Sequence, residues 1–211
     1  EDAAEALGSW RSHMGANTHC GLFGNIGTIS FNGNKLITTG GGGALITNDS
    51  NMAKKARHLS TTAKKTHPWE FDHDQIGWND RLPNLNAALG FAQLEILTQK
   101  LQIKRQLMER YFEEFEKNSL KDLKLLIEPK NCRSNYWLNT LRFCDEDLSK
   151  AQEQKKALLE QSHKRGLLVR PCWKLLNTLP MYQNSPCGVL NVATNECNRL
   201  INLPSSTQLL S

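Results

Sequence analysis

The sequence lacks the patterns that mark metal-binding, disulfide-rich and membrane-spanning proteins. Its six cysteines form no CxxC pair, and no group of His and Cys has the spacing of a zinc site. No apolar run in the 211 residues is long enough to cross a bilayer. Irregularly spaced cysteines in a chain of this length are typical of reduced thiols, so we expect a cytoplasmic protein. We expect no metal and no membrane partner.

A strong excess of charge of one sign is also absent. Lys and Arg number 26 against 21 Asp and Glu, which gives a net charge of +5, and hydrophobic residues make up 39 %. The basic residues are spread along the chain, and the densest clusters, at 54–57 and 64–65, are short. This distribution indicates a solvated surface and argues against a nucleic-acid partner. The composition is that of a globular protein with enough chain for a core.

Local patterns predict an α/β protein. Strand signals at 27–30 and 43–49 precede a helix that begins near Asp49 or Ser50 and ends near Ser60. Residues 61–83 predict a long loop, whose aromatic side chains argue against disorder. The strongest helical period covers 84–118 as one apolar stripe, expected to pack in a core or an interface. Beyond it we expect strands in 123–129, 134–144 and 167–170, a helix from near Ser149 to Gly166, and a short helix running into a strand over 191–204.

The segment ISFNGNKLITTGGGGALITND (29–49) places one lysine, Lys35, between a strand and four glycines. A lysine amine becomes a nucleophile toward an aldehyde when it is desolvated or lies near other positive charge. Ser30 and loop amides could bind a phosphate, and Asp2 could pair with a pyridinium nitrogen. The same residues also fit an exposed lysine, a glycine turn and a capping aspartate, so the residues alone leave both interpretations open. A P-loop is excluded, because in GxxxxGK[ST] the lysine follows the glycines.

Five collinear blocks together resemble one enzyme family. The blocks EDAA, SFNGNK, ITTGGGGAL, HPWE and GWNDRLPNLNAALG are similar to those of the DegT/DnrJ/EryC1/StrS sugar aminotransferases, pyridoxal-phosphate enzymes of fold type I. The stretches TTAK–HPWE and SNYWLN are most similar to the branch that aminates UDP-linked 4-keto-6-deoxy sugars on the way to legionaminic acid and bacillosamine-type sugars. The resemblance covers nearly the whole chain.

The resemblance implies a division of the chain into three parts. Residues 1–83 would be the C-terminal part of the large cofactor-binding domain, 84–118 a connecting helix, and 119–211 a smaller, incomplete α+β domain. Both ends are expected to be cuts through a longer protein. The missing part would supply a phosphate-binding turn and an aromatic residue that stacks on the cofactor, so this chain alone is expected to bind the cofactor poorly.

The resemblance also implies roles for the residues around the lysine. Lys35 would be the Schiff-base lysine and proton shuttle, Asp2 the partner of the pyridine nitrogen, and Ser30 a phosphate ligand. Glu5 occupies the place beside the phenolic oxygen of the cofactor. These four residues are the expected cofactor site for pyridoxal 5'-phosphate.

A second set of residues is expected to act across a dimer interface or on the substrate. Asn79 would reach the cofactor phosphate of the neighbouring subunit of a homodimer, with Arg81 as a polar neighbour. His67, Trp69 and His73 are candidates for contact with the nucleotide sugar, and an exposed packing loop is the alternative. Arg170 could contact the diphosphate or be an ordinary strand-end arginine. Many family members carry Tyr at the position of Trp78, so the cross-subunit loop could differ here.

The expected function is therefore pyridoxal-phosphate-dependent transamination of a UDP-4-keto-6-deoxy-N-acetylhexosamine, with glutamate as amino donor, in the synthesis of surface-glycan amino sugars. One alternative is a sugar dehydratase of the same fold that uses pyridoxamine phosphate. Such enzymes have His at the lysine position, so Lys35 argues against this alternative. The other is a truncated, non-catalytic relative that keeps only a dimerisation surface.

Overall fold

The computed structural model describes residues 1–13 and 15–210, which form two compact units. The first unit comprises Glu1–Gln102 with Glu128–Trp137, and the second comprises Ile103–Ile127 with Leu138–Ser211. The division falls inside helix α3 (Leu97–Lys117). The segment 128–137, which the sequence assigned to the C-terminal part, lies in the first unit.

Strand β3 (Gly27–Ser30) is central to the first unit. It pairs antiparallel with β4 (Gly43–Ile46), in register from Gly27↔Ile46 to Ser30↔Gly43, so both predicted strands are confirmed. On the other edge of β3, Asp2 forms a parallel bridge with Thr28. The N-terminal segment that carries Asp2 and Glu5 is thereby fixed beside the strand that leads to Lys35.

The four glycines before β4 are explained by backbone geometry at two positions. Gly42 has φ +95°, a conformation that residues with a Cβ rarely adopt. A Cβ on Gly43 would lie 2.3 Å from the carbonyl oxygen of Ile29, because β3 passes directly against it. The glycine run therefore lets β4 return tightly onto β3.

A second small sheet in the first unit was not predicted. Strands β1 (Trp10–His13) and β2 (Ala16–His19) form a hairpin, and β6 (Cys132–Arg133) pairs with β1. The four-residue strands are short and polar, so they carry no clear alternation of apolar residues.

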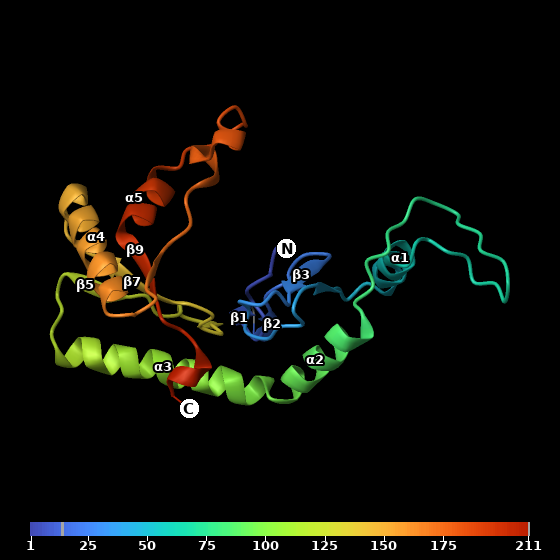
Figure 1. Ribbon diagram of the computed structural model, residues 1–211, viewed down its shortest axis with the longest axis horizontal. Coiled ribbons are helices and arrows are strands. Elements are labelled where there is room, and N and C mark those ends of the chain that lie inside the picture. Colours follow the sequence, from blue (N-terminus) through green and yellow to red (C-terminus); the bar gives the residue numbers. More distant parts are fainter. Residues whose placement is uncertain (14, 211) are drawn as a thin grey trace. The chain divides into compact units, whose positions relative to one another are not determined.

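Helix α1 (Ser50–Ser60) begins where the sequence predicted. The Asp49 side chain accepts hydrogen bonds from the backbone N–H groups of Asn51 (2.8 Å) and Met52 (3.2 Å), so Asp49 and not Ser50 is the N-cap. After α1, the chain makes a long excursion over 61–83 that Figure 1 shows leaving and returning as two neighbouring extended stretches. Bridges between Thr61 and Asn79 and between Lys64 and His73 hold the two stretches together.

The predicted single helix over 84–118 is wrong, because the helix is interrupted at Ile96. Helix α2 (Asn84–Glu95) ends there, and α3 begins at Leu97. The side chain of Gln93 pairs with both backbone groups of Thr38, accepting from its N–H (3.2 Å) and donating to its C=O (2.9 Å). These contacts fix α2 to the irregular segment after Lys35, and apolar periodicity does not reveal them.

The predicted apolar stripe is divided between buried and exposed residues. Leu107 and Met108 of α3 are buried, whereas Leu85 and Leu89 of α2 are exposed. Gly90 is the one buried residue of α2.

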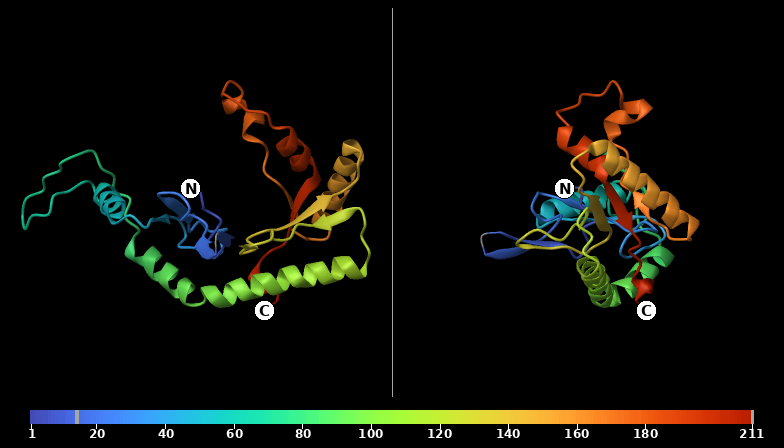
Figure 2. Two further views of the ribbon diagram at one scale, coloured as in Figure 1. Left: turned by 180° about the vertical axis from the view of Figure 1, so that it is seen from behind. Right: turned by 90° about the vertical axis from the view of Figure 1, so that its left-hand side faces the viewer.

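The second unit is built on a four-stranded antiparallel sheet of order β5–β7–β9–β8. Its strands are β5 (Leu123–Leu125), β7 (Asn139–Phe143), β8 (Arg170–Pro171) and β9 (Leu200–Leu203). Helices α4 (Leu148–Lys164) and α5 (Asn191–Arg199) lie side by side against β7, as the two views of Figure 2 also show. The core is formed by Leu141, Phe143, Ala151, Val169 and Ile201. Three short 3-10 helices complete the unit: Leu176–Thr178, Pro180–Tyr182 and Thr207–Leu209.

Several boundaries in the second unit differ from the predictions. The strand expected in 134–144 is confined to Asn139–Phe143, and that in 167–170 to Arg170–Pro171. Helix α4 begins at Leu148, near the predicted Ser149, and is capped by Asp147, whose side chain accepts from the N–H of Ser149 at 2.9 Å. It ends as predicted before Gly166, which has φ +75°.

A charged pair joins β7 to α5 in this unit. Arg142 donates to both carboxylate oxygens of Glu196, at 2.7 and 2.8 Å. The hydrogen bond from Arg142 lowers the pKa of Glu196, and the same bond raises the pKa of Arg142. Because the guanidinium donates to both carboxylate oxygens, such a pair fixes the relative orientation of the two side chains as well as the distance between them.

Among the helices of residues 1–13 and 15–210, none combines the length and the apolar character needed to traverse a bilayer. In the same residues no three His, Cys, Asp or Glu side chains gather as a metal site would require.

Candidate functional site

Lys35 follows a tight turn at the end of β3. Its backbone N–H donates to the carbonyl of Asn32 at 3.0 Å, which closes a four-residue turn around Gly33 and Asn34. The Ser30 hydroxyl accepts from the N–H of Asn32 at 3.2 Å. Short polar residues and glycine suit such a turn, so the local sequence places the lysine directly after the strand.

The Lys35 side chain is largely buried and has two partners. Its side chain is 13 % exposed, and its ammonium forms an ion pair with the carboxylate of Glu5. The ammonium also lies 4.5 Å from the ring centroid of Trp137. The structure therefore does not place Lys35 as an ordinary solvent-exposed lysine, which was one of the two interpretations left open by the sequence.

Asp2, Glu5, Ser30 and Lys35 occupy adjacent backbone segments. Ala3 donates its N–H to Thr28 at 3.0 Å, and Ser30 donates its N–H to Ala4 at 3.3 Å, so the N-terminal segment runs along β3. Asp2 is exposed, and one of its oxygens accepts from the N–H of Ala4 at 3.2 Å. The carboxylate predicted to meet a ring nitrogen is thus accessible on a neighbouring segment.

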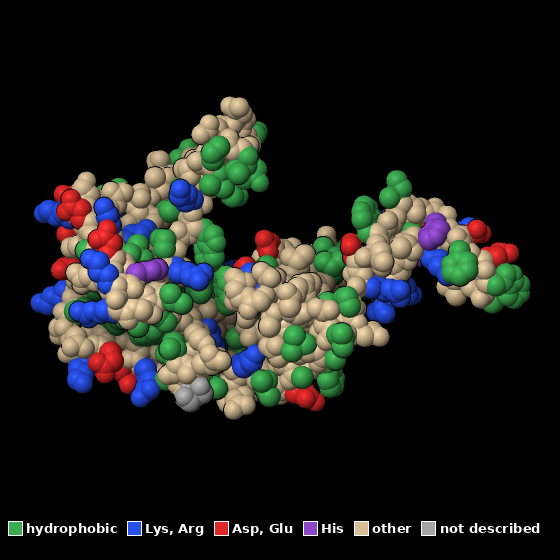
Figure 3. Space-filling view, in the orientation of Figure 1, with side chains coloured by type: hydrophobic (Ala, Val, Ile, Leu, Met, Phe, Trp, Pro, Cys, Tyr) green, Lys and Arg blue, Asp and Glu red, His purple; other side chains and the backbone are tan. Residues whose placement is uncertain are grey.

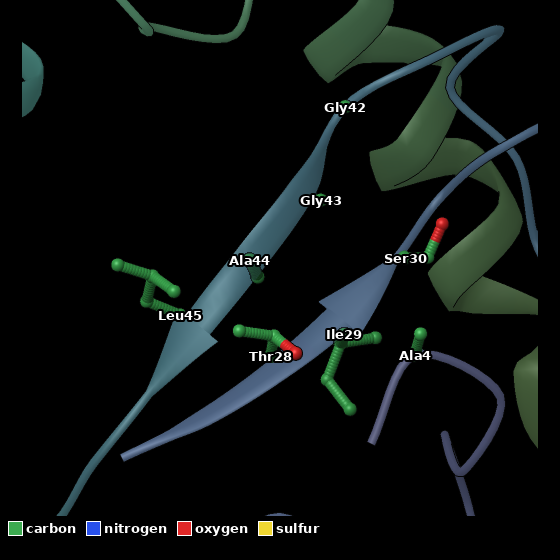
Figure 4. A pocket seen from close by; sticks show the side chains of 8 residues that line it. All are labelled: Ala4, Thr28, Ile29, Ser30, Gly42, Gly43, Ala44 and Leu45. Atoms are coloured by element: carbon green, nitrogen blue, oxygen red, sulfur yellow. The ribbon is translucent and has the colours of Figure 1, made fainter. Parts of the chain in front are cut away.

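A shallow hollow of about 320 Å³ lies beside these residues. Figure 4 shows β3 at its centre, with β4 on one edge and the segment of Ala4 on the other. Ser30 lines this hollow, whereas Asp2, Glu5 and Lys35 do not. Ser30 therefore belongs to the predicted set by its position on the chain, and its hydroxyl borders a space distinct from the lysine.

A second, larger hollow of about 550 Å³ is formed by α1 and the excursion that follows it. Four cationic side chains and four uncharged polar ones line it together with His67: Arg57, Lys64, Lys65, Arg81, Thr61, Thr62, Thr66 and Asn79. We call this hollow the basic pocket. No carboxylate is among its lining residues, so its chemistry suits an anion.

Backbone close approach shapes the basic pocket. A Cβ on Gly77 would lie 2.5 Å from the N of Ala63 and 2.6 Å from the carbonyl carbon of Thr62, so the two stretches of the excursion touch only because residue 77 is glycine. Thr62 and Ala63 both have positive φ, of 66° and 50°. This crossing brings Asn79 next to Thr61.

The structure brings some of the predicted substrate residues together and separates others. His67, Asn79 and Arg81 all line the basic pocket. Trp69 is 74 % exposed and packs edge-on against His67, with ring centroids 4.9 Å apart. His73 instead lies 2.7 Å from the carbonyl of Thr62.

Arg170 is an exposed residue of β8 in the second unit.

Close to the basic pocket, His58 lies 2.7 Å from Asp74, and this hydrogen bond lowers the pKa of the Asp74 carboxyl. Figure 3 shows basic side chains toward α1 and apolar ones toward the tip of the excursion.

Several residues at these positions carry no functional signal in the sequence. Arg57, Lys64 and Lys65 have the spacing of a solvated surface, yet they line one hollow. Trp137 and Asn135 belong to the SNYWLN block, which served only as a mark of resemblance.

Comparison with known proteins places the chain in a family. The model of the DegT/DnrJ/EryC1/StrS aminotransferase family matches residues 1–211. GDP-perosamine synthase of Escherichia coli O157:H7 is 33 % identical over 99 % of the chain and 53 % of its own length. UDP-4-amino-4,6-dideoxy-N-acetyl-beta-L-altrosamine transaminase of Helicobacter pylori is 31 % identical over 86 % of the chain and 46 % of its own length.

Solved structures agree with these relatives. PseC of Helicobacter pylori, an aminotransferase involved in the biosynthesis of pseudoaminic acid, superimposes with a TM-score of 0.86 at 27 % identity, over 99 % of this chain and 54 % of its own. The chain spans about half the length of the curated relatives it matches. With the family model matched from the first residue to the last and the α/β fold shared, the chain belongs to the DegT/DnrJ/EryC1/StrS aminotransferase family.

Proposed function

We propose that the protein is a pyridoxal-phosphate-dependent aminotransferase acting on a nucleotide-linked 4-keto-6-deoxy-N-acetylhexosamine, with glutamate as amino donor, in the synthesis of surface-glycan amino sugars. The observation that carries the proposal is the Lys35 amine, largely buried between the Glu5 carboxylate and the Trp137 ring. Aminotransferases of this family use pyridoxal 5'-phosphate. The cytoplasmic location stays a prediction.

The residues around Lys35 fit that cofactor by the chemistry of their groups. Lys35 supplies an amine for the aldehyde, Asp2 a carboxylate for the ring nitrogen, Glu5 a partner for the phenolic oxygen, and Ser30 a hydroxyl for the phosphate. When bound, the cofactor supplies an electron sink for the carbon that loses a proton.

Lys35 is the group of this chain that would move protons, as general base and general acid. Its burial limits the access of water to the amine, and the Glu5 carboxylate forms an ion pair with the ammonium. Asp2 would act only electrostatically, by keeping a ring nitrogen protonated. The proposed roles are supported by the positions on the chain, since Ser30 ends β3, Lys35 follows it after a turn, and the segment of Asp2 and Glu5 runs beside the strand.

The basic pocket supports a phosphate-bearing ligand. Arg and Lys side chains bind phosphate oxygens by charge-assisted hydrogen bonds, and threonine hydroxyls add neutral donors. We assign the diphosphate of the nucleotide sugar to this pocket, with His67 and Trp69 beside it. In a homodimer Asn79 and Arg81 would also reach the cofactor phosphate of the neighbouring subunit. Arg170 and His73 remain proposed substrate contacts.

The nucleotide is the finer part of the proposal. The relatives include proteins named for GDP and for UDP sugars, and we propose UDP because of the resemblance of the TTAK–HPWE and SNYWLN stretches. Parallel binding measurements with UDP and GDP test the choice. Tighter binding of GDP would overturn it without touching the aminotransferase assignment.

The experiment that tests the function uses the full protein and pyridoxal 5'-phosphate. We expect an absorbance band that borohydride reduction makes permanent, with the added mass on the peptide that contains Lys35. Lys35→Ala should abolish the band, whereas Lys55→Ala, an exposed lysine of α1, should leave it unchanged.

Two outcomes would contradict the proposal. Absence of the band in the wild-type protein would favour a non-catalytic relative. A band that persists in Lys35→Ala would show that the cofactor bonds elsewhere. Release of 2-oxoglutarate from glutamate in the presence of the cofactor tests the amino donor separately.

A further inference from the structure

The segment 134–137 carries two side chains that reach the lysine site from a distant part of the sequence. Asn135 is 4 % exposed, and its side-chain amide donates to the backbone carbonyls of Glu5 (2.6 Å) and Leu7 (2.9 Å). Its side-chain oxygen accepts from the N–H of Trp137 at 2.9 Å. Asn135 therefore ties the backbone that carries Glu5 to the backbone that carries Trp137.

Trp137 makes two contacts with the lysine turn. Its indole Nε1–H donates to the carbonyl of Asn34 at 2.7 Å. Its ring lies 4.5 Å from the Lys35 ammonium. One contact fixes the backbone immediately before the lysine, and the other fixes the end of the lysine side chain.

The ring contact acts on a side chain that would otherwise be mobile. A lysine has four rotatable carbon–carbon bonds, so its amine samples many positions unless it is held. The Glu5 carboxylate and the Trp137 ring both contact the ammonium, and the ring also shields it from water. A reacting amine gains rate from being held in one place before the substrate arrives.

We propose that Trp137 is a positioning residue for the Lys35 amine, and that Asn135 is the brace that holds Trp137 and Glu5 in register. The role in catalysis rests on the proposed function. The geometric part does not, because restraint and shielding of Lys35 can be measured without cofactor or substrate.

The test separates the two contacts of Trp137 with two substitutions. Trp137→Phe keeps an aromatic ring for the ammonium and loses the Nε1–H donor, whereas Trp137→Leu loses both. Trp10→Phe is the matched control, since Trp10 lies in β1 and packs edge-on against His19. Asn135→Ala tests the brace.

The first measurement is the rate at which an amine reagent labels Lys35 in the cofactor-free full protein, followed by mass spectrometry. We expect Trp137→Leu and Asn135→Ala to increase the rate by about fivefold, the order of one cation–π contact. Trp137→Phe should lie between Trp137→Leu and the wild type, and Trp10→Phe should match the wild type.

The second measurement is steady-state kinetics with glutamate. Trp137→Leu is expected to lower kcat by about tenfold or more, with KM for glutamate changed less than about twofold, because positioning acts on the chemical step. Trp137→Phe should restore part of kcat. A merely structural role would instead lower the fraction of folded protein while leaving kcat per folded site unchanged.

Unchanged labelling of Lys35 in the folded Trp137→Phe and Trp137→Leu proteins would overturn the proposal. If Trp137→Leu does not fold, Trp137→Phe decides alone, and a labelling rate and kcat equal to those of the wild type would overturn it. Failure of the wild-type protein to bind pyridoxal 5'-phosphate would refute the proposed function, yet the labelling comparison would still decide whether Trp137 restrains Lys35.

Discussion

At the scale of single residues, the basic pocket holds an unusual concentration of like charge. Arg57, Lys64, Lys65 and Arg81 line one hollow. Among the residues that the structure describes, only Lys64 of these four contacts a charged or aromatic side chain, with its ammonium 3.8 Å from the ring centroid of Phe71. Like charges that line one hollow repel one another, and dissolved salt weakens this repulsion. An anion in the hollow would remove that repulsion.

This arrangement predicts which substitutions weaken nucleotide binding. We expect Arg57→Gln and Lys65→Gln each to weaken UDP binding by about fivefold to tenfold, because a hydrogen bond to a charged group contributes about 1.5 kcal/mol or somewhat less in a solvated pocket. Calorimetric titration at two salt concentrations measures the effect, and the wild type should lose more affinity with salt than either variant. Lys54→Gln, on α1 but outside the pocket lining, is the control. Equal affinities in the three variants would contradict the assignment of the diphosphate to this pocket.

At the scale of elements, the sequence predicted well where an element's own residues decide its limits. Asp49 caps α1 with its own side chain, and Gly166 ends α4 by its positive φ. Prediction failed where partners distant in sequence decide. The break at Ile96 accompanies contacts between Gln93 and Thr38, 55 positions apart, and the hairpin β1–β2 gains its third strand from Cys132–Arg133.

The same distinction applies to the candidate site. Lys35, Asp2 and Ser30 could be found because a strand, a turn and a family resemblance mark them. Trp137 could not be assigned to the lysine, because only the tertiary structure brings residues 102 and more positions apart into contact. The basic pocket was hidden for the same reason, since its cations come from α1 and from both stretches of the excursion.

Helix α3 is joined to the segment after β9 by a buried lysine. Lys104 is 4 % exposed, and its ammonium donates to the carbonyl of Ser205 at 2.5 Å. Tyr111, two turns along the same helix, donates its hydroxyl to the carbonyl of Pro204 at 2.9 Å. Burial lowers the pKa of Lys104 from 10.5 to about 8.

This shift predicts how stability depends on pH. Between pH 8 and the ordinary lysine value, the unfolded chain binds a proton that the folded chain does not, so stability should rise through that interval. Below this interval Lys104 carries its proton in both the folded and the unfolded state, so the full free-energy cost of burying the charge opposes folding. Relative to Lys104→Met, the wild type should therefore gain on the order of 2 kcal/mol between pH 7.5 and pH 10. Urea unfolding at several pH values measures this difference. Lys121→Met, an exposed position in the same unit, should keep the wild-type slope, and an equal slope in Lys104→Met would contradict the prediction.

At the scale of the whole molecule, helix α2 leaves exposed the apolar side chains that a helix of its composition normally buries. A helix that is apolar around much of its circumference is normally buried. In the described residues α2 buries only Gly90, while Leu85 is 86 % and Phe91 is 68 % exposed. Leu89, Leu94 and Ile96 are also exposed. We propose that a second copy of the protein covers this surface, in the homodimer expected from the family resemblance.

The proposed dimer interface leads to a quantitative prediction for α2. Burying a Leu or Phe side chain contributes about 2 kcal/mol, so the double variant Leu85→Glu/Phe91→Glu should weaken dimerisation of the full protein by well over tenfold. Sedimentation over a range of concentrations measures the change, and Val189→Glu, equally exposed in the second unit, is the control. A double variant that stays dimeric but unfolds more readily would mean that another part of the same protein covers α2. That outcome would contradict the dimer interface at α2, because an interface residue changes the association constant before it changes the stability of the fold.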